Sequence, residues 1–261
     1  MKLNDEDMFC GVRPASLWPR ILPITLWVWA LGSLALFFSG SFPAYAQERK
    51  ALFHEGFKNL DNWKPLYFAK IEKHTVYSIE SKDDEHYLRA ESNGSASGLV
   101  YKETFNVYDY PKIRWRWKIS NVYEKGDGRT NANDDYPIRI YVLFEYEPQR
   151  AGALDKIKYG LAKAIYGEYP PHSAINYVWS SVAWGVPFIT SPRTDKVKVV
   201  ALESGAKKAG TWQEEEVDAL QDYRRMFGAE PPAKASLGIM SDSDNTAEHA
   251  ISFISFVEIY R

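Results

Sequence analysis

Apolar and polar residues alternate with a period of two along much of the chain, which predicts half-buried β-strands. The clearest case is IRWRWKI, residues 113–119: Ile113, Trp115, Trp117 and Ile119 share one face, and basic residues occupy the other. IRIYVLFEY, residues 138–146, follows the same pattern and places its isoleucines on the face opposite Arg139. Both segments are therefore expected to cover a core with one face only.

Further segments extend this β pattern. KVKVVAL (196–202) reads as another strand, and AISFISFVEIY (250–260) is apolar at both parities, which predicts burial on both faces. Shorter strands are expected at four places, with turns such as SKDDE between them: LFHEGF (52–57), TVYSIE (75–80), YLRAES (87–92) and SGLVYKETF (97–105). Many short strands with little β–α alternation predict a mainly β fold, an antiparallel β-sandwich of the jelly-roll kind.

Two segments carry helical signals, so one or two short helices should pack on the sandwich. In residues 210–232, Thr211 and Glu214 form a capping-box pattern, arginines fill the last turn, and Gly228 stands as the glycine after it. In residues 152–167, leucine and isoleucine recur at helical spacing.

The first 46 residues read as a signal peptide. A mildly basic start precedes the apolar run of residues 21–38, and Ala44-Tyr45-Ala46 has the small-residue form that a signal peptidase recognises. We therefore expect cleavage after Ala46, a single domain over residues 47–261, no stable membrane span after cleavage, and a periplasmic or secreted protein exported as in Gram-negative bacteria. A retained membrane anchor is the alternative.

Composition restricts the chemistry of the exported part. The single cysteine, Cys10, lies in the leader, so disulfides and thiol chemistry are excluded from the rest. The leader holds three basic and three acidic residues, and the remaining 29 basic and 31 acidic residues keep the net charge of −2. Because the basic residues are interspersed with acidic ones, no nucleic acid or other polyanionic partner is expected.

Acidic and amide residues are concentrated in two short stretches. The first, NANDDYPIRI, contains Asp134 and Asp135 shortly before Arg139, and the second, SDSDNT, contains Asp242, Asp244 and Asn245. The second lacks the glycine and glutamate of an EF-hand loop, which excludes that motif. Both stretches could be polar turns. Alternatively they meet across a sheet and form a ligand or calcium-like metal site, with Asp242 and Asp244 as the metal ligands, or an acid/base pair.

Aromatic residues cluster in YGEYPPHSAINYVWSSVAWG, residues 166–185. Flat rings beside amide and hydroxyl groups suit a groove for a sugar, which makes Tyr177 and Trp179 candidate ligand-binding residues. A core strand rich in aromatic residues is the alternative. The chain contains no G-x-S-x-G, H-E-x-x-H, P-loop or G-x-G-x-x-G motif, and its histidines are isolated, so no catalytic class is indicated.

Four stretches in this order resemble the bacterial exported family named domain of unknown function 3047: NDDYPIRIYVLFEY, INYVWSS, EEEVDALQDYRRMFG and LGIMSDSDNTAEHAISFISFVEI. The resemblance covers about residues 52–261, and the chain departs from it at Val217-Asp218, where the family usually has Arg-Asp. A more distant similarity to galactose-binding and carbohydrate-binding-module jelly rolls implies a β-sandwich, often with a structural calcium ion. The family name itself implies no activity.

Three functions are compatible with these observations. The first is a non-catalytic sandwich that binds a glycan or another cell-envelope component through the candidate residues. The second is a glycan hydrolase or lyase that uses the aspartates as acid/base groups or metal ligands. The third is an envelope scaffold that binds a partner protein.

Overall fold

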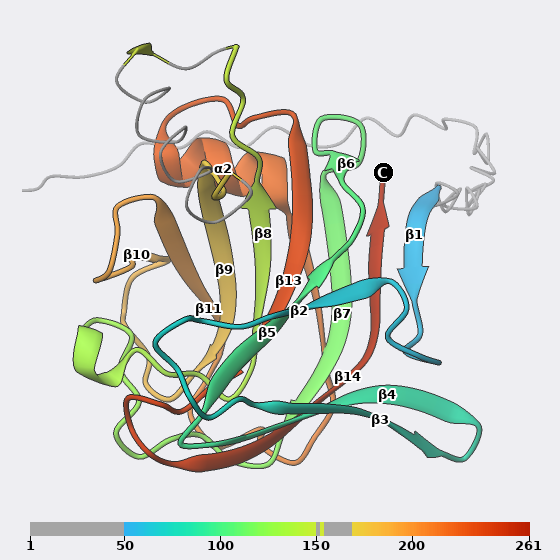
Figure 1. Cartoon of the computed structure of the whole chain (residues 1–261), viewed down its shortest axis with the longest axis vertical. Coiled ribbons are helices and arrows are strands. Elements are labelled where there is room, and N and C mark those ends of the chain that lie inside the picture. Colours follow the sequence, from blue (N-terminus) through green and yellow to red (C-terminus); the bar gives the residue numbers. More distant parts are fainter. Residues whose placement is uncertain (1–49, 150–151, 154–168) are drawn as a thin grey trace, which may run out of the picture. The chain divides into compact units, whose positions relative to one another are not determined.

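Two β-sheets packed face to face make up a β-sandwich in the computed structural model of this protein (Figure 1). The structure describes residues 50–149, 152–153 and 169–261, which belong to one compact unit spanning Gln47–Arg261. The predicted mainly β sandwich is confirmed. The predicted signal peptide and nearly all of the helix predicted at 152–167 lie outside the described residues, and cleavage after Ala46 stays a prediction.

The first sheet has six strands in the order β12-β7-β14-β4-β3, and β1 also pairs with β14. Its strands are β1 (Ala51–Glu55), β3 (Val76–Lys82), β4 (Glu85–Asn93), β7 (Lys112–Ile119), β12 (Gln213–Asp218) and β14 (His249–Tyr260). All its pairings are antiparallel. β14 alternates in burial up to a bulge near Ser255 and is buried on both faces only from Val257 to Tyr260, so the burial predicted for the whole strand holds for its last part.

The second sheet has eight strands in the order β10-β11-β9-β8-β13-β5-β2, and β6 also pairs with β13. Its strands are β2 (Trp63–Leu66), β5 (Ala96–Tyr101), β6 (Phe105–Asn106), β8 (Arg139–Phe144), β9 (Ser173–Ser180), β10 (Ile189–Thr190), β11 (Val197–Ser204) and β13 (Lys234–Asp242). Most of its pairings are antiparallel, but β9 and β11 run parallel. The chain between them includes β10, which forms a hairpin with β11.

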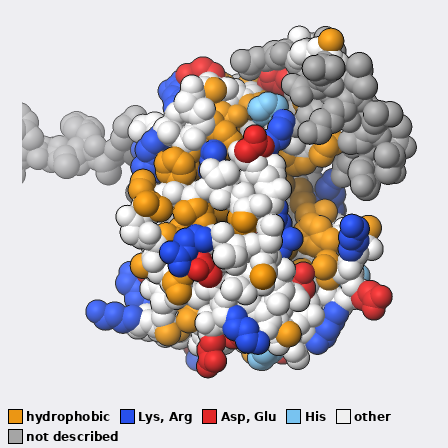
Figure 2. Space-filling model, turned by 90° about the vertical axis from the view of Figure 1, so that its left-hand side faces the viewer, with side chains coloured by type: hydrophobic (Ala, Val, Ile, Leu, Met, Phe, Trp, Pro, Cys, Tyr) orange, Lys and Arg blue, Asp and Glu red, His pale blue; other side chains and the backbone are white. Residues whose placement is uncertain are grey.

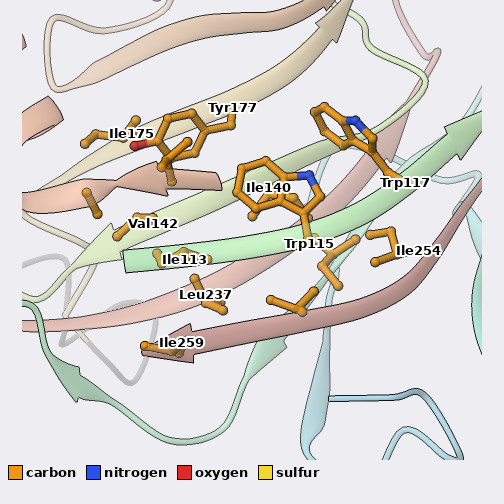
Figure 3. Close-up of a cluster of buried hydrophobic side chains, with 14 of the residues drawn as sticks. Ile113, Trp115, Trp117, Ile140, Val142, Ile175, Tyr177, Leu237, Ile254 and Ile259 are labelled. Carbon is orange, nitrogen blue, oxygen red and sulfur yellow. The ribbon is translucent and has the colours of Figure 1, made fainter. Parts of the chain in front are cut away.

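The core lies between the sheets and is built from the alternating positions (Figure 3). Trp115 and Trp117 of β7 are fully buried, and their rings lie 5.7 Å from Tyr177 and 6.0 Å from Trp179 of β9, measured between ring centroids. Large aromatic side chains from both sheets therefore meet at the centre, where each removes a large apolar area from water.

The predicted helix at 210–232 is only half right. Residues 213–218 form strand β12, and the helix α2 begins afterwards, at Ala219, and ends at Phe227. Asp218 rather than Thr211 is the N-cap, since its Oδ1 accepts a hydrogen bond from the Gln221 amide. Gly228 has φ 65° and ends the helix in the left-handed conformation, as predicted.

Pairing with β7 explains the strand at 213–218. Val217 is buried opposite Ile113, while Glu214 and Glu216 point to solvent. The run of glutamates suits the first turn of a helix, but its alternation also fits an edge strand, and the sheet pairing decides between the two. A short 3-10 helix, η1 (Asn131–Asn133), is the other helical element with described bounds.

Glu215 of β12 faces the core side and accepts a hydrogen bond from Trp117 Nε1 at 3.2 Å. Burial, with a smaller contribution from Glu203, raises its pKa to about 7. Because folding raises the pKa of this carboxyl, the protein loses stability as the pH rises from about 4.3, the pKa of a free glutamate, to about 7, its pKa in the folded protein.

We expect Glu215→Gln to raise the free energy of unfolding by on the order of 1–3 kcal/mol at pH 8, and to leave it nearly unchanged at pH 4. Urea unfolding at both pH values checks this. Glu214→Gln, on the exposed face of the same strand, is the control, and an equal effect there would contradict the assignment.

The outer face of the eight-stranded sheet carries a set of polar side chains. On β8, Ile140 and Val142 point into the core, so Arg139, Tyr141 and Leu143 point the other way. The register places Arg139 beside Met240 of β13, and Tyr141 between Gly238 of β13 and Asn176 of β9.

Among the described residues, no helix is long and apolar enough to cross a membrane.

Candidate functional site: a charged cluster and a groove on the eight-stranded sheet

The two acidic stretches meet at one end of the eight-stranded sheet. β8 begins at Arg139 and β13 ends at Asp242, and because the two strands are antiparallel neighbours, the loop before one lies beside the turn after the other. The structure thereby brings together Asp134, Asp135 and Arg139 with the turn that contains Asp242, Asp244 and Asn245.

Arg139 and Asp242 form a buried ion pair at the centre of this cluster. The exposed fractions of the two residues are 4% and 2%. Arg139 Nε donates to Asp242 Oδ1 at 2.9 Å, and Nη2 donates to Oδ2, so the planar guanidinium meets both carboxylate oxygens. The Arg139 guanidinium also lies over the ring of Tyr136, 4.7 Å from its centroid. The pair is therefore almost entirely buried.

Burial perturbs the ionisation of this cluster. It raises the pKa of the Asp242 carboxyl well above its usual range; Arg139 opposes this rise, and Asp135 adds to it. Burial also raises the pKa of Asp135, against a hydrogen bond from Thr246. The Arg139 pKa is raised although burial opposes its charge, chiefly because Asp242 lies beside it. The arginine therefore stays charged and is the group that stabilises the carboxylate form of Asp242.

Arg193, in the loop between β10 and β11, joins the neighbouring loops. Its Nε donates to Asp134 Oδ2 at 3.0 Å, and its Nη2 donates to Asn245 Oδ1 at 2.9 Å and to the Asn131 carbonyl at 3.3 Å. Asn245 Nδ2 donates to the same carbonyl at 3.0 Å. The Arg193 side chain is about half exposed. Asn245, a predicted site residue, thus helps to connect these loops through its hydrogen bond with Arg193. Arg193 was not among the residues predicted from the sequence.

Asp135, Asp242 and Asp244 could together hold a metal ion. One carboxylate oxygen from each lies within 4.8 Å of those of the other two. Asp135 Oδ2 accepts a hydrogen bond from the Thr246 amide at 2.6 Å, but its buried Oδ1 has no hydrogen-bond partner. Hard oxygen donors of this kind suit Ca²⁺ or Mg²⁺. Asp135 was not among the predicted metal ligands, and Asp242 would share its carboxylate between the ion and Arg139.

Beside the cluster, the outer face of the sheet is hollowed into a pocket of about 630 Å³, here called the polar groove. It is lined by Tyr67, Phe68, Ala69, Lys70, Ile71, Ala96, Asp134, Arg139, Tyr141, Asn176, Ser191, Arg193, Thr194, Val197, Val199, Met240, Asp242 and Asp244. Asn176 is 1% exposed, and its Oδ1 has no hydrogen-bond partner. On one face of the molecule, Figure 2 shows hydrophobic side chains gathered between charged ones.

Tyr177 and Trp179 lie elsewhere. Both side chains point into the core and are fully buried. Tyr177 Oη donates to Asp222 Oδ2 at 2.7 Å, and Trp179 Nε1 donates to the Gly205 carbonyl at 3.1 Å. Their predicted place in a ligand groove is therefore corrected to one in the core. Because β9 is buried on both faces, its sequence does not show which alternate residues face the groove. In the structure, Asn176 faces the groove and its aromatic neighbours face the core.

The sequence model of a family described as "Protein of unknown function (DUF3047)" matches residues 61–258. No curated protein matches the chain in sequence.

Several solved structures are similar at low identity. The family 11 carbohydrate-binding module from Clostridium thermocellum, in complex with a β-1,3-1,4-mixed-linked tetrasaccharide, is 11% identical over 81% of this chain and 94% of that one, with a TM-score of 0.39. Winged bean acidic lectin, complexed with methyl-α-D-galactose, is 11% identical over 82% and 100%, with a TM-score of 0.37. The enzymatically active domain of bacteriophage CBA120 tailspike protein 4 is 8% identical at a TM-score of 0.37, and the match covers 79% of this chain but only 20% of the tailspike.

Proposed function

The chain belongs to the DUF3047 family, and we propose that it is an exported, non-catalytic protein that binds a glycan in the polar groove. One observation carries the proposal: on the outer face of the eight-stranded sheet, unsatisfied or half-exposed hydrogen-bonding groups lie beside aromatic rings in one pocket of about 630 Å³. Export is tested by the N-terminal sequence of protein recovered from a periplasmic extract, which should begin at Gln47. A chain that still carries the leader in the membrane fraction would overturn it.

The chemistry of the groove matches that of a sugar ring, which has polar edges and apolar faces. Tyr141 and Phe68 supply flat apolar surface, and Tyr67, which is 61% exposed, stands at the rim. Asn176 Oδ1 is an acceptor with no partner, and half-exposed Arg193 carries donors. Each of these groups suits a hydroxyl.

Charge balance favours a neutral ligand. The basic side chains that line the groove are Lys70, Arg139 and Arg193, and the acidic ones are Asp134, Asp242 and Asp244. With equal numbers of each sign, the lining offers no net attraction to a polyanion. An uncharged glycan fits this lining best.

Binding also accounts for the aspartates better than hydrolysis does. An acid/base pair must reach the scissile bond. Asp242 meets the groove with both oxygens already bonded to Arg139, and Asp135 is buried and does not line the groove.

A glycan panel tests the proposal directly. The wild type should bind at least one neutral oligosaccharide saturably, and Tyr141→Ala should weaken that binding by tenfold or more while the melting temperature stays within a few degrees. Tyr108→Ala, a half-exposed tyrosine outside the groove, is the matched control. Flat responses across the panel, or equal weakening in both variants, would count decisively against the groove.

We further propose that Asp135, Asp242 and Asp244 bind a Ca²⁺ ion. Millimolar Ca²⁺ should raise the melting temperature at pH 7.5, because an ion that binds only the folded state stabilises it. The gain should shrink at pH 5, since the pKa values of Asp135 and Asp242 are raised and protons compete with the ion. Thermal melts with and without Ca²⁺ at both pH values measure this effect.

The matched variants for this test are Asp135→Asn and Asp84→Asn. Asp135→Asn should abolish the Ca²⁺ effect. Asp84 lies in the exposed β3–β4 turn with φ 65°, a conformation that asparagine tolerates, so its variant should keep the effect. No Ca²⁺ response in the wild type at pH 7.5 would exclude a calcium site here.

A further inference from the structure

The polar groove continues into a second pocket of about 430 Å³, here called the apolar arm. Its lining is mainly apolar and includes Leu66, Leu143, Ala174, Gly238 and Ile239, with Lys196 as its one charged residue. Leu66, at the rim, is 39% exposed, so a large apolar side chain stands at the opening. The volume alone is within the range of pockets that take small molecules.

The two pockets adjoin each other, and together they form a space with a polarity gradient. They share Phe68, Tyr141, Thr194, Val197 and Met240. Along β8 the outward-facing residues change from Arg139 through Tyr141 to Leu143, and along neighbouring β13 they change from Asp242 through Met240 to Gly238. One end of the space is therefore charged and the other apolar.

Gly238 of β13 forms part of the floor of the apolar arm. A Cβ at this position would lie 3.3 Å from Tyr141 Cβ and 3.5 Å from Leu143 Cδ1, so it would occupy the gap between these two side chains. The φ of Gly238 is not in the positive range, so its backbone does not require glycine. Glycine within a strand is unfavourable, and it often marks a place where a ligand approaches closely. At Gly238 a Cβ would be crowded by Tyr141, so the glycine lets Tyr141 and Leu143 lie close to this central strand.

We propose that the ligand is an amphiphile: a glycan whose attached alkyl or acyl chain lies in the apolar arm while its sugar lies in the polar groove. The inference rests on the proposed function and specifies its ligand class. Its support is that the two pockets adjoin and share five lining residues, and that their lining changes from charged to apolar in one direction. A purely polar oligosaccharide would leave the apolar arm exposed to water, whereas a chain of methylenes would cover it.

Alkyl maltosides of increasing length test the inference. Octyl-, decyl- and dodecyl-β-D-maltoside, each below its micelle-forming concentration, are titrated into the wild type by calorimetry beside maltose. Affinity should rise on the order of tenfold for each two methylenes that become buried. Gly238→Val, which suits a strand but fills the floor, and Leu143→Gln should remove most of this dependence on length. Leu52→Gln, at an exposed leucine of β1, is the matched control and should keep it.

The outcomes separate this inference from the proposed function. In one outcome the protein binds the glycan panel, but its affinity for the maltosides does not depend on chain length. That result would overturn the proposal of an amphiphilic ligand and leave the proposal of glycan binding intact. In another outcome no glycan of the panel binds, but maltoside binding increases with chain length and Leu143→Gln removes it. That result would overturn the proposal of glycan binding and assign the apolar arm to an alkyl chain. A concentration-dependent dimer dispersed by Leu143→Gln would assign the apolar arm to a second copy and overturn the inference. If Gly238→Val fails to fold, Leu143→Gln alone decides.

Discussion

Replacing Arg139 with methionine should lower the free energy of unfolding by about 3–5 kcal/mol, because it leaves a buried carboxylate without its charge partner. Asp242 is 2% exposed and receives two hydrogen bonds from Arg139. Asp134 and Asp135 lie nearby, so the remaining charges repel one another. Urea unfolding at pH 7.5 measures the loss. The loss should be smaller at low pH, where protonation removes the unpaired charge.

Two further variants distinguish a buried pair from a surface contact. The double variant Arg139→Met with Asp242→Leu should recover much of the stability, since removing both partners leaves no unpaired charge. Arg193→Met removes a half-exposed arginine that also contacts Asp134, and should cost about 1 kcal/mol or less. If Arg139→Met lies within about 1 kcal/mol of the wild type, the pair is not the centre of the cluster.

Trp179→Ala should destabilise the protein by about 3–5 kcal/mol, the usual cost of removing a buried tryptophan from a core. The ring is fully buried and lies 6.0 Å from that of Trp117 in the opposite sheet. Below its lowered melting temperature, the variant should still bind the panel glycan, because the ring does not reach the polar groove. Urea unfolding and glycan titration on the same preparation provide both readings.

Trp212→Ala is the control for this substitution. Trp212 is half-buried beside Lys118 on the outer face of the other sheet, so its removal should cost clearly less. If Trp179→Ala keeps the unfolding midpoint of the wild type but loses glycan binding, Trp179 belongs to the ligand site and not to the core.

The strands were predictable because alternation records which face of a strand is buried. The plainest case is β7, where Trp115 and Trp117 alternate with basic residues. The structure confirms that the tryptophans are buried and that the basic residues lie on the other face. The start of α2 was not predictable in the same way. The glutamates at 214–216 satisfy both a helical first turn and an edge strand, and only the pairing of Val217 with Ile113, about a hundred residues away, selects the strand.

The candidate site was predictable only in part. The acidic stretches were visible in the sequence, and the structure brings Asp135 and Asp242 together because β8 and β13 are neighbours. Arg193 and Asn176 were missed for different reasons. Arg193 lies in an irregular loop with no periodicity to place it, and Asn176 lies on a strand buried on both faces. Which side chains line a groove depends on sheet register, which a local pattern does not contain.

Methionine methyl signals give the most direct test of the claim that the groove on the eight-stranded sheet binds the ligand. Met240 lies on the floor shared by the polar groove and the apolar arm, and Met226 lies buried in α2 as an internal reference. The protein labelled at methionine methyls is titrated with the best glycan from the panel, and Met240→Leu assigns the signal. We expect the Met240 methyl signal to shift saturably, with the affinity measured by calorimetry, and the Met226 methyl signal to stay in place. A saturating glycan that leaves Met240 unchanged would place the binding site elsewhere on the molecule and contradict the account.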